Sequence, residues 1–402
     1  LRFPSVAPCL RGESPSRPNP FSHGWAFGEG RGRWQGAFFA AVEKLAAKAT
    51  ARIICVSQHD YDMALRRGIA PAEKLVLIRN GIEAELFLKA DGGKVRAELN
   101  LGDRPVVTMG VFDGVHLGHR MLLRRVVREA ANTGSDSVAV TFDPHPRIVL
   151  AGDPAHLRFL TDIDERTDLL RETGIGHLVI IPFTHELSRM TASEFVESIL
   201  CRHLGVSHLI TGFNHHFGRR HEGDNETLLN CSRSMDFRVT REEAFTLDGE
   251  AVSSSSIRKL IEAGDIKRAS ALLGYDYFVS GTVVSGKRIG RNLGFPTANI
   301  SPRFAYKLIP RSGVYAVEAE LEGDARSHIA MLNIGLRPTV SDGAAHRTIE
   351  AHIIDYDADL YGKAITIRFR ERLRDEMKFE SVDALVSQLG RDREKTITLL
   401  RP

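Results

Sequence analysis

Two histidines in a glycine-containing turn are the first residues of the chain that could do chemistry. His116 and His119 belong to the sequence FDGVHLGH, which follows an apolar run at 106–111 and precedes an amphipathic run at 120–132. In open α/β sheets, phosphates bind where a parallel strand ends and a helix begins. Each imidazole could donate a hydrogen bond to a phosphate oxygen as charge develops on a leaving pyrophosphate. A metal site is the alternative, but no further Cys, Asp or Glu ligand stands at an obvious spacing.

A second segment, GTVVSGKRIGRNLGFPTAN at 281–299, combines four glycines with three cations. Backbone N–H groups in glycine-rich turns form nests that bind anions, and the cations add positive charge. Thr297 and Asn299 provide short oxygen donors that suit Mg²⁺ held together with ATP oxygens. The segment predicts a second phosphate site, and the alternative is an ordinary hairpin with a basic turn.

These two segments require a frame of strands and helices to position them. Apolar runs alternate with amphipathic runs from about residue 105, with strands expected at 106–111, 137–142, 177–183, 208–212 and 237–240 and helices at 120–132, 162–173, 192–204 and 256–263. That alternation predicts an α/β domain at 105–274 with a doubly wound, Rossmann-like parallel sheet.

The pattern changes from residue 278 onward, where Gly and Pro turns separate strands and few helices are expected. The expected strands are at 279–284, 314–320, 328–334, 347–354 and 365–369, and a closing amphipathic helix is expected at 381–399. This part, 275–402, is therefore predicted to be a small antiparallel β-barrel with a C-terminal helix.

The first hundred residues differ from the rest. Five of the 16 prolines fall within residues 1–20, and residues 1–50 carry seven basic and three acidic side chains. We expect 1–36 to be a disordered or loosely ordered tail, because such a composition buries little apolar surface. The chain starts at Leu1, which is consistent with a fragment or an unusual gene model.

Residues 37–104 form a separate stretch, with helices expected at 37–48 and 58–67 and strands at 52–57 and 74–78. Its sequence IICVSQHDYDMALRRGIAPAEKLVLIRNGIEAELF resembles the end of the first domain of two-domain retaining glycosyltransferases. The sugar-nucleotide domain of that family does not follow. We therefore expect a fused remnant and linker, or a misjoined reading frame, without glycosyltransferase activity.

The segment 105–274 resembles the bacterial FAD synthetase module, a member of the HxGH nucleotidyltransferase superfamily. The resemblance is carried in order by GVFDGVHLGH at 110–119, TFDPHP at 141–146, TGFNHHFG at 211–218 and SSSSIR at 253–258. It implies catalytic roles for His116, His119 and Arg258. It implies ATP binding by Gly110, Phe112, Asp113, Gly114, Gly118, Ser254 and Ser255, and flavin binding by Pro144, His145 and Asn214.

Three positions depart from that family's pattern. Ser256 stands where Arg is common, and His215 and Asn214 replace an aromatic and an acid. We expect adenylyl transfer to persist at a reduced rate. The alternative for the serine run is a simple helix N-cap, which we favour for Ser253.

The segment 275–402 resembles riboflavin kinase. The resemblance is carried by PTAN at 296–299, NIGLRPT at 333–339, TIEAHIIDY at 348–356 and DLYG at 359–362. It implies that Glu350 is the general base, although a lone Glu in a strand is usually a solvated residue. It implies ATP binding by Gly286, Lys287, Gly290 and Gly294, and a metal held by Thr297 and Asn299. It also implies flavin contact by Arg372 in the charged segment 368–379. The alternative for that segment is a solvated strand end.

Together the resemblances imply that the barrel phosphorylates riboflavin to FMN and the α/β domain adenylylates FMN to FAD, both with Mg²⁺ and ATP. The alternatives are a kinase with an impaired second module and a non-catalytic flavin-binding protein. The net charge of +3 and the lack of a long apolar run argue against nucleic acid or membrane partners. Four widely spaced cysteines fit a reducing cytoplasm. Assembly into a homo-oligomer is left open.

Overall fold

The computed structural model describes residues 92–151, 153, 156–214, 217–219, 222–286, 290, 293–338 and 345–401, and the backbone of two earlier strands. These two strands, β1 (Ile53–Cys55) and β2 (Leu75–Leu77), pair in parallel. They confirm the strands expected at 52–57 and 74–78. The expected tail and the helices at 37–48 and 58–67 lie outside the described residues.

A five-stranded parallel sheet organises the first domain, in the order β5-β4-β3-β6-β7. Its strands are β3 (Val106–Met109), β4 (Ser137–Asp143), β5 (His177–Pro182), β6 (His208–Thr211) and β7 (Arg238–Arg241). The chain runs outward from β3 to β5 and then crosses back to β6. The direction of winding therefore changes between β3 and β6, and ligands of open α/β sheets bind at such a point.

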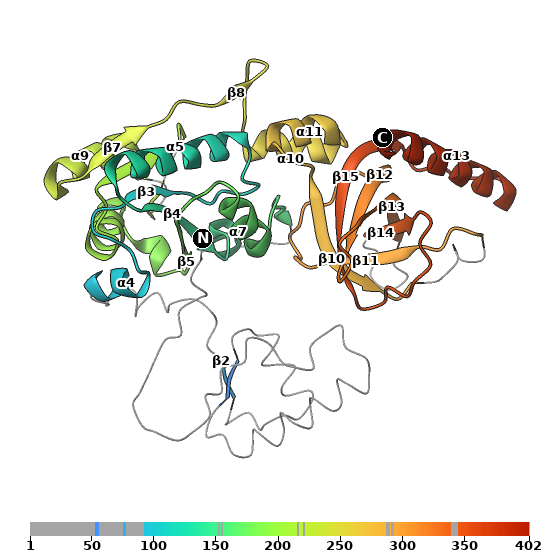
Figure 1. The fold of residues 1–402 in the computed structure, drawn as a ribbon, viewed down its shortest axis with the longest axis horizontal. Helices are drawn as coiled ribbons and strands as arrows, with labels where there is room; N and C mark the ends of the chain where they lie inside the picture. The colour runs from blue at the N-terminus through green and yellow to red at the C-terminus, as the bar shows by residue number, and fades with distance from the viewer. Residues whose placement is uncertain are drawn as a thin grey trace.

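Helices cover both faces of this sheet, as the alternation predicted (Figure 1). Successive side chains of a strand point to opposite faces, and accordingly Val106 and Val107 belong to two different cores. One core includes α5 (Leu117–Thr133) and α7 (Ile163–Arg171). The other includes α4 (Gly92–Glu98), α8 (Ala192–Phe195), the π-helical η4 (Val196–His203) and α9 (Asn225–Met235).

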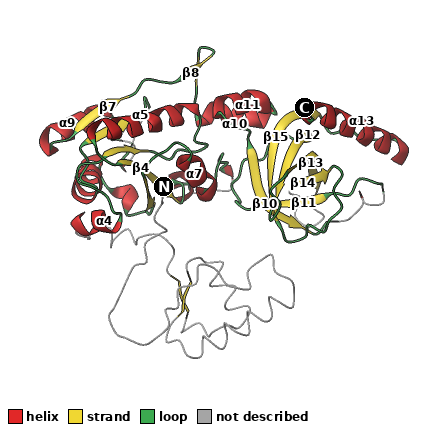
Figure 2. Cartoon of the chain, in the orientation of Figure 1, coloured by secondary structure: helices red, strands yellow, loops and turns green. Residues whose placement is uncertain are grey.

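The second domain is a closed antiparallel barrel in the order β10-β11-β14-β13-β12-β15 (Figure 2). Its strands are β10 (Phe278–Val284), β11 (Ala298–Pro302), β12 (Gly313–Leu321), β13 (Ser327–Pro338), β14 (Ala345–Ile353) and β15 (Ala364–Arg374). The C-terminal helix α13 (Val382–Leu400) contacts β12 and β13. The barrel and its closing helix confirm the fold expected for this part.

Two further helices, α10 (Ser254–Ala263) and α11 (Ile266–Leu273), lie between the sheet and the barrel (Figure 1). Their apolar side chains, such as Ile257 and Ile261, are fully buried in the same cluster as Tyr315 of the barrel. The short elements are α6 (Pro146–Leu150), η3 (Leu187–Arg189) and the hairpin of β8 (Thr246–Leu247) and β9 (Glu250–Ala251). Within the described ranges, every helix is too short or too polar to cross a membrane.

Candidate active sites

The turn between β3 and α5 forms a sharp elbow that presents both histidines of the HxGH sequence. Phe112, Gly114 and Val115 have positive φ angles of 53°, 81° and 34°. Such angles are costly for residues other than glycine and persist where the surroundings enforce them, often at functional sites. A Cβ at Gly114 would collide with the Leu160 side chain, so both the angle and the space require glycine there.

The histidines stack on each other at the start of α5. Their ring centroids are 3.6 Å apart, and His116 N-caps the helix through its Nδ1, which accepts the His119 N–H at 3.3 Å. An imidazole whose Nδ1 accepts a hydrogen bond carries its proton on Nε2 when neutral. His116 can therefore donate from Nε2 to a phosphate oxygen. Two of the predicted glycines pack against aromatic rings of the elbow: Gly110 lies next to the Phe112 ring, and Gly118 lies next to the His116 ring.

Both histidines are held neutral. Burial, followed by the nearby Arg258 guanidinium, lowers the pKa of His116 to about 4. Burial also lowers the pKa of His119 well below its usual value, with His116 and Arg166 adding to the effect. At neutral pH the pair therefore supplies hydrogen-bond donors rather than permanent cations.

Asp113 connects the elbow to the cation predicted to hold phosphate. Its Oδ2 lies 2.8 Å from Nη1 of Arg258, and its Oδ1 accepts the N–H groups of Leu160 and Thr161 at 2.9 and 3.0 Å. The Asp113 residue is only 4% exposed. Protein donors thus occupy the Asp113 carboxylate, which in turn orients Arg258. Asp113 therefore contributes to the predicted ATP site through Arg258.

The serine run lies at the start of α10, against the same elbow. Ser254 donates to the Asp113 carbonyl at 2.9 Å, and Ser255 accepts from Arg258 at 3.2 Å. Ser253 is the N-cap, as favoured for that residue, and Ser256 completes the capping box with it. Ser256 therefore has a helix-capping contact at the position where the family commonly has Arg.

The predicted flavin-side residues lie at the ends of neighbouring strands. Pro144 and His145 follow β4, and His145 stacks on Phe159 with ring centroids 4.1 Å apart. Burial, followed by nearby arginines, lowers the pKa of His145 to about 3. Asn214 follows β6 and is exposed, whereas His215 lies outside the described residues. The carboxyl ends of β3, β4 and β6 thus bring the predicted residues to one edge of the sheet.

Sequence reasoning missed two residues that hold this elbow. Arg166 on α7 is 3% exposed and donates to the carbonyls of Val111 and Phe142, which joins the ends of β3 and β4. Tyr275 donates to the Gly114 carbonyl at 2.6 Å. The available signal was weak, because Arg166 is one of several charged residues in the sequence of α7.

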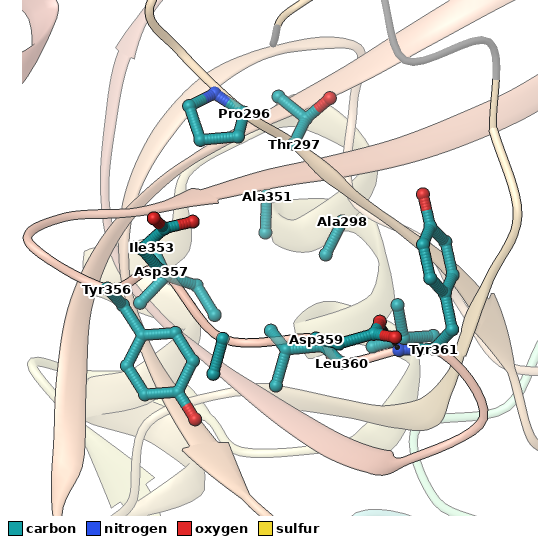
Figure 3. Close-up of a pocket in the computed structure, with 12 residues that line it drawn as sticks. Pro296, Thr297, Ala298, Ala351, Ile353, Tyr356, Asp357, Asp359, Leu360 and Tyr361 are labelled. Carbon is teal, nitrogen blue, oxygen red and sulfur yellow. Dashed lines mark hydrogen bonds between the residues drawn. The ribbon is translucent and has the colours of Figure 1, made fainter.

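The second candidate site lies where β11 and β14 meet the loop at 356–361. A cavity there has an apolar floor and a polar rim (Figure 3). The floor includes Ala298, Ala351 and Ile353, and the rim includes Thr297 and Tyr361. Such a mixture can hold a flat ring on its floor and polar groups at its edge.

Glu350 stands beside two amide side chains in the barrel wall. It is paired in register with Asn299 of β11 on one side and with Asn333 of β13 on the other. Residues directly opposite in antiparallel strands share a face of the sheet. The predicted general base and one predicted metal ligand are therefore neighbours, on the face opposite to Ala351.

The glycines of the cationic segment approach both predicted metal ligands. A Cβ at Gly286 would overlap the Asn299 amide nitrogen, and one at Gly290 would lie 3.4 Å from Thr297 Oγ1. Gly294 adopts a φ of 79° in the following turn. Lys287 lies outside the described residues.

Arg372 is not brought to this cluster. It lies on β15 opposite Tyr315, donates to the Ser312 carbonyl at 2.7 Å and pairs with Asp375. A Cβ at Gly335 would instead lie 2.9 Å from the Glu376 carboxylate, close to Asn333. Sequence reasoning did not single out Asn333, the register partner of Glu350, or Glu376, which lies beside Gly335. The NIGLRPT sequence was the signal for Asn333.

Two family models match the chain in the order of the two domains. The one described as FAD synthetase matches residues 101–256, and the one described as riboflavin kinase matches residues 273–400. Both matches begin after residue 100, so the glycosyltransferase resemblance at 37–104 stays a prediction.

Several relatives share both parts. A bifunctional riboflavin kinase/FMN adenylyltransferase from Listeria monocytogenes is 35% identical over 291 residues, covering 72% of this chain and 91% of that protein. One from Escherichia coli (strain K12) is 35% identical over 302 residues, covering 74% and 95%. A solved structure described as a macrolide-efflux protein from Streptococcus pneumoniae has 31% identity and a TM-score of 0.67, covering 74% of this chain and 95% of that one.

These relatives are matched over nearly their whole length, through both domains in one order. The chain therefore belongs to the bifunctional riboflavin kinase/FMN adenylyltransferase family.

Proposed function

We propose that this chain makes FAD from riboflavin in two ATP-dependent steps, with riboflavin kinase activity in the barrel and FMN adenylyltransferase activity in the α/β domain. The observation that carries the proposal is the match of both family models in one order. Incubation with riboflavin, ATP and Mg²⁺, with products resolved by chromatography, tests it. FMN should appear first and FAD second. Absence of FMN would refute the kinase assignment. Formation of FMN without FAD would refute the adenylyltransferase assignment.

In the α/β domain, a phosphate oxygen of FMN attacks the α-phosphorus of ATP while the bond to pyrophosphate breaks. Nε2–H of His116 and the His119 ring face the phosphates as donors, and the Arg258 guanidinium offsets the growing negative charge. The Asp113–Arg258 pair at 2.8 Å supports this assignment, because it fixes the cation at the elbow. Ser254, Ser255 and the elbow backbone complete the ATP site, and Pro144, His145 and Asn214 face the flavin.

In the barrel, Glu350 accepts the proton of the ribityl 5′-hydroxyl as that oxygen attacks the γ-phosphorus of ATP and the bond from this phosphorus to ADP breaks, releasing ADP. The cavity above Ala298 and Ala351 suits the flat base of the nucleotide (Figure 3). Thr297 lies at the cavity rim, so a base on this floor would direct its phosphates toward the glycine-rich segment that includes Gly286, Gly290 and Lys287.

Mg²⁺ would be held by Thr297 and Asn299 together with nucleotide phosphate oxygens. A hydroxyl and an amide oxygen are hard donors that suit this ion, and the missing side chain at Gly286 lets the glycine-rich segment approach the Asn299 amide closely. When bound, the ion neutralises phosphate charge. The described part of the chain has no group of three or more His, Cys, Asp or Glu residues placed to hold a metal alone, which fits a site shared with the nucleotide.

The domain limits follow from packing. Val95 and Leu101 are buried in the same core as Val107, so we begin the adenylyltransferase domain at residue 92 rather than 105. We place the kinase domain at 275–402.

The free thiols of Cys201 and Cys231 are consistent with the reducing cytoplasm as the location of the protein.

A kinase with an impaired adenylyltransferase is the second candidate, because Ser256 caps a helix where the family commonly has Arg. Comparing FAD formation by the wild type and by Ser256→Arg tests it. A large gain for Ser256→Arg would favour this candidate, whereas rapid FAD formation by the wild type would reject it.

A further inference from the structure

One short segment of the barrel domain, 303–308, lies directly against residues 157–166 of the α/β domain, which include the start of α7. Phe159 N–H donates to the Tyr306 carbonyl at 2.9 Å, and Leu308 N–H donates to the Phe159 carbonyl at 2.8 Å. Phe159 and Lys307 form a parallel β-bridge. The two domains therefore share backbone hydrogen bonds at this point.

A buried ion pair lies at the centre of this contact. Lys307 Nζ is 2.6 Å from Glu165 Oε2, with the two side chains 2% and 3% exposed, and it also donates to the Leu160 carbonyl at 2.7 Å. Beside it, Arg303 makes two hydrogen bonds to Asp162 Oδ2, at 3.0 and 2.8 Å. Removing one member of a buried pair is costly, because the other charge then lacks its partner.

The segment 157–166, which Lys307 and Arg303 hold, also contacts the elbow through Leu160 and Thr161. Leu160, whose carbonyl accepts from Lys307, donates its N–H to Asp113 Oδ1. Thr161 also donates to that oxygen, and its own Oγ1 accepts the Gly114 N–H at 3.0 Å. Asp113 Oδ2 then fixes Arg258. A continuous set of contacts thus runs from Lys307 of the barrel to the proposed phosphate-binding cation.

A second contact links the barrel to the proposed flavin side. The Phe159 ring stacks on His145 at 4.1 Å and lies near Phe304 and Tyr306 of the barrel, at 6.2 and 6.3 Å. A shift of the segment 303–308 would therefore displace residues of both proposed substrate sites of adenylyl transfer.

We propose that the segment 303–308 of the kinase domain is a structural part of the adenylyltransferase site, and that Lys307 is a positioning residue for adenylyl transfer. It acts through Leu160 and Asp113 on Arg258. The proposal rests on the proposed function, since it concerns the same site. It makes the two activities unequal: adenylyl transfer requires the barrel, whereas FMN formation does not require the segment 157–166.

The test compares Lys307→Met with Lys267→Met in the full chain. Lys267 pairs with Glu371 at 2.6 Å across the same two domains, but its side chain is 69% exposed. Adenylyl transfer is measured with supplied FMN and FMN formation with riboflavin, each over a range of ATP concentrations. Circular dichroism records folding.

For Lys307→Met we expect kcat/KM of adenylyl transfer to fall at least tenfold with a raised KM for ATP, while FMN formation stays within twofold. Lys267→Met should change neither activity more than twofold. The KM matters because partial unfolding lowers kcat without changing KM. Unchanged adenylyl transfer in folded Lys307→Met, or equal loss of both activities, would overturn the proposal.

If Lys307→Met does not fold, Arg303→Met decides. The Arg303 side chain is 47% exposed, so its loss is tolerated more easily. Adenylyl transfer should fall threefold to tenfold with a raised KM for ATP, and an unchanged rate would overturn the proposal. If the wild type itself makes no FAD from FMN, the proposed adenylyltransferase function has failed, and the role of Lys307 fails with it.

Discussion

At the scale of single residues, the elbow depends on imidazoles that stay uncharged. His116 is 5% exposed and faces Arg258, so a second positive charge there is unfavourable until a nucleotide brings negative phosphates. The neutral ring donates one hydrogen bond from Nε2 while its Nδ1 caps α5. One side chain thus both begins the helix and faces the proposed phosphate site.

This arrangement predicts an acid-sensitive α/β domain. The pKa of His116 is 6.5 in the unfolded chain and about 4 in the folded one. Between these values the unfolded chain binds a proton that the folded chain does not, so stability is complete above pH 6.5 and is lost as the pH falls toward 4. At pH 5 the loss from His116 alone is about 2 kcal/mol.

Urea unfolding of the wild type and of His116→Asn at pH 7.5 and pH 5 measures this effect. Asn keeps a side-chain oxygen for the helix cap but does not titrate. The difference in unfolding free energy between the two pH values should be about 2 kcal/mol smaller in the variant. Equal differences in both proteins would contradict the assignment of a depressed pKa to His116.

At the scale of elements, the kinase site depends on the close approach of Gly286, just after β10, to β11. Gly286 touches the Asn299 amide, so a methyl group at Gly286 would push apart the segment proposed to bind phosphate and a proposed metal ligand. Gly286→Ala should lower kcat/KM of FMN formation at least tenfold and leave adenylyl transfer of supplied FMN within twofold.

Gly390→Ala is the matched control for that substitution. Gly390 lies in α13, and nothing stands within 4 Å of a Cβ placed there. Alanine favours a helix interior over glycine, so this variant should be about 0.5–1 kcal/mol more stable with both activities unchanged. Normal kinase activity in Gly286→Ala would show that the close approach to Asn299 is not needed.

The strands and helices were predictable from the sequence where their periodicity is strong. All five strands of the parallel sheet were expected within a few residues, because most of them contain a short apolar run between helix-like segments. The strand β11 was not expected, since ANISP is short, mixed in polarity and ends in Pro. The run expected as one helix at 192–204 divides into α8 and the π-helical η4, and no local residue signals that change.

The site was predictable only in part. Motifs such as FDGVHLGH and PTAN named residues that the structure brings together, including Arg258 with Asp113 and Asn299 with Glu350. The contacts of Arg166 and Lys307 were not predictable, because they depend on how α7 and the barrel pack against the elbow.

At the scale of the whole molecule, two ATP-dependent sites share one chain without sharing residues. The elbow follows β3 of the parallel sheet, whereas Glu350 stands in β14 of the barrel. The contact at 303–308 connects the two domains, and we propose that it supports one site and not the other. The two activities should therefore be separable by single substitutions.

The most direct measurement is the set of products that His119→Ala and Glu350→Gln form from riboflavin, and separately from FMN, with ATP and Mg²⁺. His119→Ala should convert riboflavin to FMN and stop there, because only the elbow has lost a donor. Glu350→Gln should leave riboflavin unchanged and still convert FMN to FAD. Loss of both activities in either folded variant would contradict two separate sites.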